Sequence, residues 1–185
     1  MDNTGNTEYH SERFNFVTLC EFDLNLIYEL YCSDLVMEKV MPKLNHTQAK
    51  NLLFDILKQQ QTRPCEFWRI ECACSGETMG IQGFMASKKQ RNQKCAEFGI
   101  LLRPEAFGKK VATESVTAML NYGFRTLKLE SVHAFYQADN IASGKIVEKL
   151  HFSIEPVSRQ PKQRRCEITR TDFFNHNKDF QFVGN

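Results

Sequence analysis

The sequence predicts a single α/β domain in which helices cover both faces of a central, mixed β-sheet. A chain of 185 residues has the length of one domain. Its apolar fraction of 42%, with 15 Phe, supplies enough side chains for a buried core. The apolar spacing alternates between helical and strand-like periods, in the order strand, two helices, three strands, helix, strand, helix, two strands.

The first sixty residues predict a polar lead-in, a strand and two helices. Residues 1–12 are polar, and we expect them to lack order, so that the folded domain spans 13–185. The apolar run Phe14–Leu19 suits a first strand. Asp23 precedes an apolar stripe of helical spacing and predicts the start of a helix. A second helix follows, with Thr47 as its expected N-cap.

A change to period two predicts an antiparallel meander in the middle of the chain. Strands are expected over 66–73, 78–87 and 95–103. A short turn at 75–77 joins the first two strands, and a polar loop at 88–94 joins the last two.

A strand–helix–strand unit follows the meander. Pro104 ends the last meander strand, and the longest helical pattern of the chain runs from Phe107 to Lys128. Together with a strand at 131–136, this helix should cross over the sheet and bring two strands parallel. A shorter helix is expected at 141–150. Two strands follow at 152–157 and 165–173, with a loop at 158–164 between them.

Charge and hydropathy supply no sign of a nucleic-acid or membrane partner. The formal net charge is +2 and the pI is about 8.1. The basic run Lys162–Arg165 is short and lacks interleaved aromatic residues. No apolar run approaches the ~18 residues of a membrane helix, and the N-terminus lacks an apolar signal segment. We therefore expect a soluble, cytoplasmic protein with neither nucleic acid nor membrane as its partner.

The seven cysteines include one closely spaced pair and no zinc-knuckle spacing. Cys72 and Cys74 are two residues apart, a spacing that in a strand points both side chains to one face. This spacing suits a metal or redox pair. The commoner role of such residues is as small apolar side chains in a reduced core, and we favour that role here. We expect no metal site.

The segment Ala96–Val116 carries the clearest chemical signal, because a strand turns tightly into a helix there. Amides in the first turn of a helix lack intrahelical acceptors, and the helix dipole adds positive potential, so such a junction suits a phosphate. Gly108 allows a ligand to approach the backbone. Lys109 and Lys110 lie at the helix start, where they either interact with an anionic ligand or point to solvent.

Two linked motifs extend this signal. The first is Ile100–Lys109 followed by Val111–Glu114, and the second runs from Asp139–Ser143 to Glu148–Phe152. Together they resemble the GNAT superfamily of N-acetyltransferases, in its RimJ/RimL-like branch, which acetylates N-termini of ribosomal proteins. The resemblance covers residues 13–175. It implies the GNAT fold, a twisted, mixed and mostly antiparallel sheet with helices on both faces, and acetyl-CoA as the co-substrate.

The resemblance also implies roles for individual residues. Main-chain groups of Leu101 and Leu102 would pair with the pantetheine arm as an added strand, and amides from Phe107 through Ala112 would hold the pyrophosphate. Asn140 would lie beside the pantetheine. The expected cofactor-binding set is Leu101, Leu102, Phe107, Gly108, Lys109, Lys110, Val111, Ala112, Thr113, Asn140 and Ser143.

Ser143 and Glu97 are the expected catalytic residues. Ser143 would protonate the leaving thiolate, and Glu97 would deprotonate the amine through water. A strand amide would stabilise the developing oxyanion. The structural alternatives are a local hydrogen bond for Ser143, a sheet carboxylate for Glu97 and a helix N-cap for Asn140. Trp68 is expected in the core or in a pocket wall.

The sequence departs from the family pattern at three positions. Lys110 and His151 each replace a Gly, and Val147 stands where many members carry a Tyr general acid. At helical dihedral angles, a Lys at position 110 would carry no strain. Its ammonium group would then either reach a phosphate of the cofactor or block the groove.

These departures leave two hypotheses of different class. The first is an enzyme that transfers an acetyl group from acetyl-CoA to a primary amine, which is a protein N-terminus or a small molecule. The second is a degenerate GNAT-fold protein that binds acyl-CoA or regulates a partner. The acceptor would be selected by the loops at 34–46, 88–94 and 158–164, which carry no recognisable code. The oligomeric state, including a homodimer, stays open.

Overall fold

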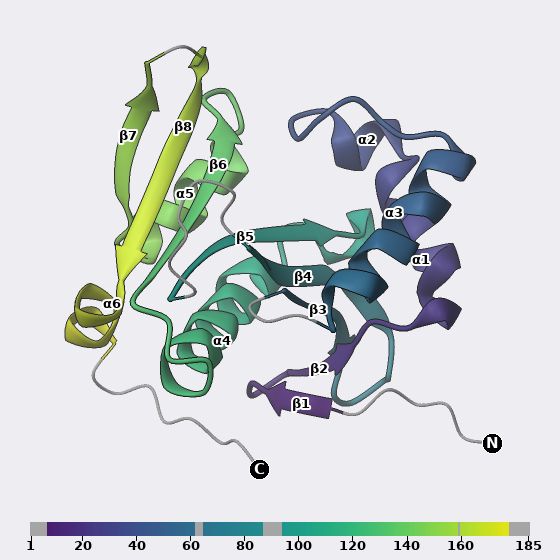
Figure 1. The fold of residues 1–185 in the computed structure, drawn as a ribbon, viewed down its shortest axis with the longest axis horizontal. Helices are drawn as coiled ribbons and strands as arrows, with labels where there is room; N and C mark the ends of the chain where they lie inside the picture. The colour runs from purple at the N-terminus through teal and green to yellow at the C-terminus, as the bar shows by residue number, and fades with distance from the viewer. Residues whose placement is uncertain (1–6, 62–64, 87–93, 159, 178–185) are drawn as a thin grey trace.

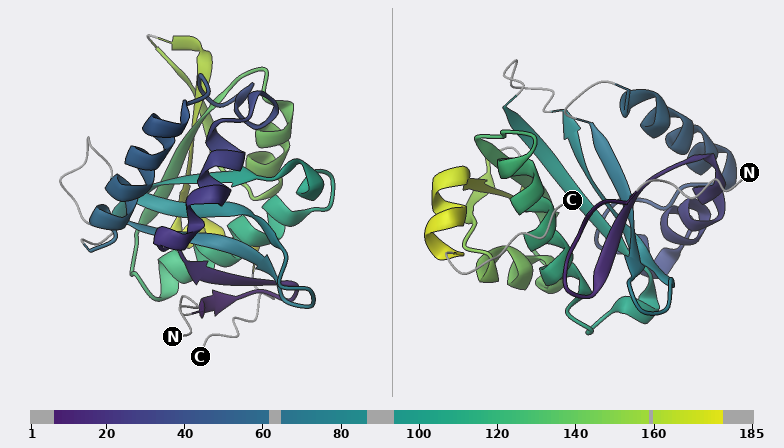
Figure 2. Two further views of the ribbon diagram at one scale, coloured as in Figure 1. Left: turned by 90° about the vertical axis from the view of Figure 1, so that its right-hand side faces the viewer. Right: turned by 90° about the horizontal axis from the view of Figure 1, so that it is seen from below.

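The computed structural model describes residues 7–61, 65–86, 94–158 and 160–177. Over these residues the chain forms one twisted sheet with helices on either side (Figures 1 and 2). The sheet has the strand order β1-β2-β3-β4-β5-β6-β8-β7. Its strands are β1 Thr7–His10, β2 Phe14–Thr18, β3 Glu66–Cys72, β4 Thr78–Ala86, β5 Cys95–Leu102, β6 Ser131–Gln137, β7 Ser153–Val157 and β8 Gln160–Thr169.

The pairing confirms the mixed sheet. Neighbouring strands are antiparallel throughout the described sheet except β5 and β6, which are parallel. The crossover between these two strands contains the longest described helix, α4, as the strand–helix–strand pattern predicts. The helical elements are η1 Glu21–Asp23, α1 Leu24–Tyr31, α2 Asp34–Met37, α3 His46–Gln59, η2 Pro104–Ala106, α4 Val111–Arg125, α5 Ile141–Lys149 and α6 Arg170–His176.

Two apolar clusters, one for each face of the sheet, show why helices cover both sides. Successive strand residues point to opposite faces, so β5 sends Leu101 to one cluster and Phe98 to the other. The cluster with Leu101 contains the buried faces of α1, α2 and α3. The cluster with Phe98 contains α4 together with side chains of α5 and α6. Trp68 is fully buried in this second cluster, as expected.

The prediction of a loose lead-in is wrong for its last residues. Thr7–His10 form β1, which extends the sheet beyond β2. The Tyr9 ring stacks between Phe16 and Tyr122, with centroid distances of 4.4 and 4.6 Å. The Tyr9 hydroxyl accepts a hydrogen bond from Gln82 at 3.0 Å, so the buried polar end of the ring is satisfied. Residues 1–6 lie outside the described part of the chain.

Three features of the N-terminal half and of the crossover also differ from prediction. The second predicted helix, α3, is capped by Asn45 rather than Thr47, because Asn45 and Gln48 form a reciprocal capping box. A short additional helix, α2, falls in the predicted loop. The predicted helix from 107 to 128 is instead a 3₁₀ turn at Pro104–Ala106 followed by α4, which starts only at Val111.

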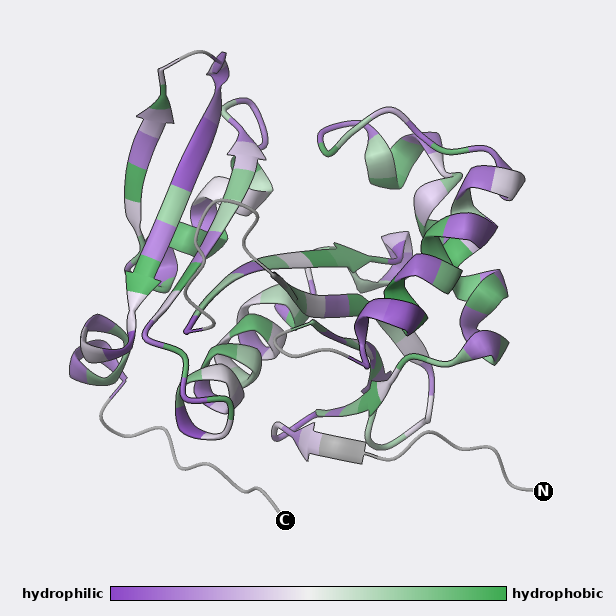
Figure 3. Ribbon diagram, in the orientation of Figure 1, coloured by the Kyte–Doolittle hydropathy of each residue, from purple (hydrophilic) through white to green (hydrophobic). Residues whose placement is uncertain are grey.

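The C-terminal end of the sheet differs most. The predicted strand at 165–173 is β8 up to Thr169, and the predicted loop before it is largely the first half of β8. Thr169 then accepts a hydrogen bond from the Asp172 amide and starts α6. Figure 3 shows why this strand is inconspicuous in the sequence, since its first half is strongly hydrophilic. No helix in the described residues is long and apolar enough to cross a bilayer.

Candidate functional site

The site is built around a gap between β5 and β6. The two strands pair in register only at Cys95–Glu97 and Ser131–His133. From Phe98 onward β5 follows β4, whereas β6 follows β8, so the strands diverge. In the described chain, the edge of β5 from Phe98 to Leu102 therefore has no neighbouring strand on this side. An extended ligand can pair with such an edge.

A groove of about 470 Å³ opens beside this edge. Its walls come from α2 and the loop after it, the end of β5, the turn before α4, and the start of α5. The groove brings together ten of the eleven residues of the expected cofactor-binding set, all except Lys109. These ten are Leu101, Leu102, Phe107, Gly108, Lys110, Val111, Ala112, Thr113, Asn140 and Ser143.

The turn before α4 holds two residues in the left-handed region of backbone space. Gly108 has a φ of 73°, which glycine adopts without steric cost. Lys110 has φ and ψ of 61° and 14°, and it occupies the N-cap position of α4. The helical dihedral angles at which a Lys here would carry no strain are therefore not adopted. Its Cβ carries a backbone cost of about 1–2 kcal/mol, which the family's Gly would avoid.

The first turn of α4 presents amide donors to the groove. The carbonyl of Lys110 accepts the first helical bond from the Glu114 amide at 3.3 Å. The amides of Val111, Ala112 and Thr113 precede that bond and have no acceptor within the helix. The amide of Phe107 donates within the preceding turn to the Pro104 carbonyl at 3.0 Å. The donors that suit a pyrophosphate thus include the three amides at the start of α4 but not the amide of Phe107.

A brace from the N-terminal hairpin holds this turn in place. Glu114 Oε1 accepts hydrogen bonds from Ser11 Oγ at 2.7 Å and from the Arg13 amide at 2.9 Å. The Arg13 guanidinium donates to Glu114 Oε2 at 2.7 Å and to the Lys109 carbonyl at 3.2 Å. Partial burial by itself raises the pKa of Glu114, but the hydrogen bonds from Ser11 and Arg13 outweigh it and lower the pKa overall.

This brace was missed by the sequence reasoning. Glu114 belongs to the first motif, but Ser11 lies in the segment that was expected to be loose, and Arg13 just follows it. No local pattern links residues about a hundred positions apart, and only the pairing of β1 with β2 brings the hairpin turn to α4.

The start of α5 forms the opposite wall of the groove. Asn140 caps this helix, because its Oδ1 accepts a hydrogen bond from the Ser143 amide at 3.1 Å. The Asn140 Nδ2 donates to the Lys39 carbonyl at 3.4 Å. The predicted N-cap is confirmed, and the same side chain lines the groove. Ser143 lies one turn along and is half-buried, between this groove and a smaller cavity behind it.

The two expected catalytic residues are placed differently. Ser143 faces the groove, whereas Glu97 is not among its lining residues. Glu97 lies at the closed end of the gap opposite His133, with 3.8 Å between Oε2 and Nε2. His133 is buried, and desolvation followed by the charge of Arg165 lowers its pKa.

A smaller cavity of about 150 Å³ lies in the gap behind the groove. Val147, at the position where many family members carry a Tyr, is buried and lines this cavity. Tyr136 on β6 lines it too, and burial raises the pKa of its phenol. The cavity thus contains a protonated phenol near the position where the family's Tyr is absent.

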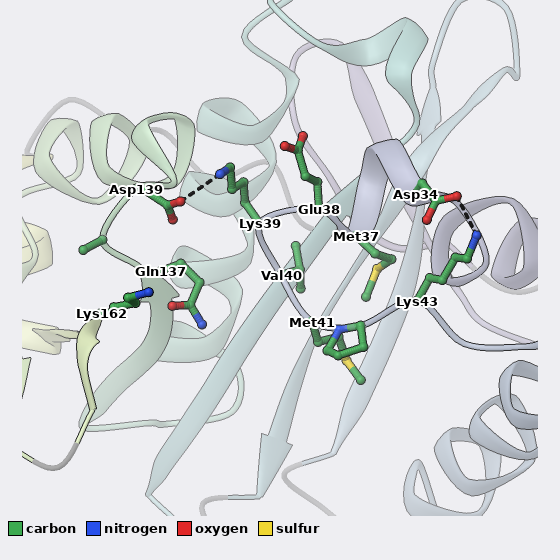
Figure 4. Close-up of a pocket in the computed structure, with 12 residues that line it drawn as sticks. Asp34, Met37, Glu38, Lys39, Val40, Met41, Lys43, Gln137, Asp139 and Lys162 are labelled. Atoms are coloured by element: carbon green, nitrogen blue, oxygen red, sulfur yellow. Dashed lines mark hydrogen bonds and ion pairs between the residues drawn. The ribbon is translucent and has the colours of Figure 1, made fainter.

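A further pocket of about 660 Å³ lies on the other side of the loop that follows α2. Figure 4 shows this loop reaching the start of α5, where Lys39 Nζ and Asp139 Oδ2 are 2.7 Å apart. The pocket brings the predicted acceptor loop at 34–46 together with Lys162 of the loop predicted at 158–164. The third predicted acceptor loop, at 88–94, lies outside the described residues except for Lys94.

Comparison with known families identifies the class of this domain. The model of the acetyltransferase (GNAT) domain matches residues 13–153. The chain therefore belongs to the GNAT acetyltransferase family.

Two curated relatives match over about half of the chain. The N-acetyltransferase YoaA of Bacillus subtilis is 33% identical over 93 residues, which cover 50% of this chain and 51% of YoaA. The spermidine N(1)-acetyltransferase of Escherichia coli K12 is 31% identical over 87 residues, which cover 47% of this chain and 46% of the relative. The chain thus spans about half the length of these relatives.

Solved structures share the fold over a larger part of the chain. The spermidine N-acetyltransferase from Vibrio cholerae, in complex with CoA and spermine, superposes with a TM-score of 0.71 and 19% identity, covering 88% of this chain and 99% of that one. An acetyltransferase from Salmonella typhimurium that modifies the N-terminal serine of ribosomal protein L7/L12 superposes with a TM-score of 0.73 and 16% identity. This superposition covers 86% of this chain and 96% of that one. At these identities the likeness supports the α/β GNAT fold alone.

Proposed function

We propose that this protein transfers an acetyl group from acetyl-CoA to a primary amine. One observation carries the proposal. The free edge of β5, the unpaired amides at the start of α4 and the capped start of α5 all face one groove. These three features match, in order, an amide-bearing arm, an anionic phosphate group and a thioester.

The groove residues supply a partner for each part of the cofactor. Main-chain groups of Leu101 and Leu102 pair with the pantetheine arm along the β5 edge. The amides of Val111, Ala112 and Thr113 hold the pyrophosphate, with the dipole of α4 aligned in its favour. The Lys110 ammonium adds a charge at the same place, and a charged hydrogen bond to phosphate contributes about 1.5–3 kcal/mol.

The reaction needs a neutral amine, a stabilised oxyanion and a protonated leaving thiolate. An amide of the β5 edge donates to the developing oxyanion. The Ser143 hydroxyl protonates the thiolate, because it lies in the groove one turn after Asn140. Glu97 accepts the proton of the amine through water, because it lies at the closed end of the gap rather than in the groove.

The acceptor enters through the pocket beside Lys39, opposite the cofactor groove. Its charged lining side chains are three acids and three lysines, which are Asp34, Glu38, Asp139, Lys39, Lys43 and Lys162. Balanced charge does not favour a substrate with several positive charges, such as the spermidine of some relatives. An acceptor with one ammonium group, such as a peptide N-terminus of the RimJ/RimL-like branch, fits this lining better.

The competing function is a degenerate acyl-CoA-binding or regulatory protein. The strained backbone of Lys110 favours it, because a side chain now occupies the position of a Gly that normally lies against the cofactor. The Lys110→Gly variant separates the two readings. Tighter acetyl-CoA binding in the variant would mean that Lys110 obstructs the groove, and weaker binding would mean that it is a phosphate ligand.

The direct test measures release of the CoA thiol with a panel of acceptors. The panel contains peptides with free N-termini, their N-terminally blocked counterparts, and spermidine. We expect turnover with free N-termini and none with blocked ones. Binding of acetyl-CoA in calorimetry without turnover on any acceptor would favour the degenerate protein. Absence of binding at millimolar acetyl-CoA would contradict the enzyme and the acyl-CoA-binding protein, and would leave only a regulatory role.

A further inference from the structure

The turn between β3 and β4 carries a pair of thiols apart from the proposed cofactor groove. Cys72 is the last residue of β3, and Cys74 lies two residues along in the turn. Their Sγ atoms are 3.1 Å apart. Cys74 is exposed and Cys72 is half-buried, so small molecules can reach the pair. The core role that the sequence favoured for these residues is therefore wrong for Cys74.

The backbone around the pair is held by hydrogen bonds. The amide of Cys72 donates to the Glu77 carbonyl at 2.8 Å, and the Cys72 carbonyl accepts from the Gly76 amide at 2.8 Å. Between the two cysteines, the Ala73 amide donates to the carbonyl of Arg13, the residue before β2, at 2.9 Å. These bonds fix the turn in a shape that keeps the two thiols side by side.

The two sulfurs differ in their readiness to ionise. Hydrogen bonds from Ser75 and then from Cys74 lower the pKa of the Cys72 thiol to about 6. The same contact with Cys72 raises the pKa of Cys74. Burial raises the pKa of Cys166 to about 12 and also raises that of Cys20. A thiolate is the reactive form of cysteine, so Cys72 is the nucleophile of the pair and Cys74 keeps its proton.

We propose that Cys72 and Cys74 form a redox-active dithiol that exchanges with small disulfides of the glutathione type. The Cys72 thiolate attacks one sulfur of the small disulfide, which forms a mixed disulfide and releases one thiolate. Cys74 then loses its proton and attacks the Cys72 sulfur, which closes the internal disulfide and releases the second thiolate. Starting from the thiolate–thiol pair, the protein loses two electrons and one proton, and the small disulfide is reduced to two thiolates, one of which can take up that proton.

The short spacing makes this exchange reversible. A disulfide that closes across one residue constrains the unfolded chain very little, because the closed loop is so short. It therefore gains little from folding, and exposed disulfides of this kind are the easily reduced ones. The pair should be a dithiol in a reducing glutathione buffer and a disulfide when oxidised glutathione is in large excess.

The test incubates the native protein with excess oxidised glutathione, blocks remaining thiols, and maps each cysteine by mass spectrometry. We expect wild type to lose two hydrogens from the peptide that contains Cys72 and Cys74, with no glutathione retained. The Cys74→Ser variant should retain one glutathionyl group on Cys72, because the resolving thiol is gone. The Cys20→Ser variant is the matched control and should behave as wild type.

A second readout is the alkylation rate of Cys72 in wild type as a function of pH. We expect a midpoint at about pH 6, because the thiolate forms there. Stable glutathionylation of wild type at Cys72 without closure would overturn the proposal, as would faster reaction at Cys20 than at Cys72. The wild-type map needs no variant, so the result does not depend on whether a variant folds.

Discussion

Two turns of this molecule carry the same departure from the family sequence, and their surroundings give it different meanings. Lys110 and His151 each replace a family Gly, and both have a φ of 61°. His151 follows the C-terminus of α5, where a left-handed residue commonly ends a helix. Its ring stacks on His176 at 4.1 Å. Lys110 instead occupies an N-cap, a position that is usually extended, and it lines the groove.

The difference teaches that a strained residue is informative only together with its neighbours. At His151 the left-handed backbone serves helix termination, and the side chain packs on α6. At Lys110 the turn is braced by Arg13 through the Lys109 carbonyl and Glu114, and it opens into the groove. Strain of about 1–2 kcal/mol that the surroundings hold in place is typical of ligand sites. Each prediction below challenges or refines this comparison.

The largest expected effect comes from substitution of Ser143. This substitution tests proton transfer separately from cofactor binding at the Lys110 turn. Ser143→Ala should lower kcat about 100-fold, since loss of a general acid typically costs 10²–10⁴ in rate. The affinity for acetyl-CoA should stay unchanged, because the capping bond to Asn140 uses the Ser143 amide and survives. Tyr136→Phe is the matched control, and steady-state kinetics with calorimetry measure both. If the Tyr136 variant loses more rate, the proton donor is the phenol.

Removal of the brace should affect the Lys110 turn and leave the His151 turn intact. Glu114→Ala leaves Ser11 and Arg13 without their shared acceptor, which should lower the free energy of unfolding by about 1–2 kcal/mol. The affinity for acetyl-CoA should fall as well, because Lys109 loses its fixed position. Urea denaturation and calorimetry measure the two effects. A stability loss with unchanged affinity would mean that the brace does not position the turn.

The same carboxylate predicts a pH dependence of stability. The folded-state pKa of Glu114 is lowered, so its contribution is fully present above the unfolded-state pKa and is lost as the pH falls through the folded-state pKa. The difference in unfolding free energy between wild type and Glu114→Gln should therefore shrink as the solution becomes acidic. A difference that grows on acidification would contradict the assignment.

Glycine at the two turns should give opposite outcomes for binding. Lys110→Gly should weaken acetyl-CoA binding about tenfold, the equivalent of losing about 1.4 kcal/mol of charged contact. His151→Gly should leave binding unchanged. Both variants relieve left-handed strain and should gain up to about 1 kcal/mol of stability, less for His151 because it loses its contact with His176. Equal changes in affinity would remove the distinction between the turns.

The local part of the site is predictable from the sequence. Pro104 ends a strand, Gly108 marks a turn, and Asn140 caps a helix, and each of these signals depends only on neighbouring residues. The three meander strands, β6 and α5 lie within one or two residues of their predicted bounds for the same reason.

The parts that failed depend on contacts between distant residues. β1 joins the sheet because Tyr9 stacks on Tyr122. The polar residues around Tyr9 give no local sign of this packing. The left-handed backbone of Lys110 depends on how the turn closes against α4, which residue type does not reveal. β8 was obscured by its hydrophilic first half, which is a strand because β6 and β7 pair with it on either side.

Calorimetric titration of wild type and Lys110→Gly with acetyl-CoA tests the central claim most directly. If the groove is an acetyl-CoA site that uses the Lys110 turn, wild type should bind one equivalent, and the variant should bind about tenfold more weakly. No binding by wild type at millimolar acetyl-CoA would contradict the site. Tighter binding by the variant would contradict the role of Lys110 and indicate a groove that its side chain obstructs.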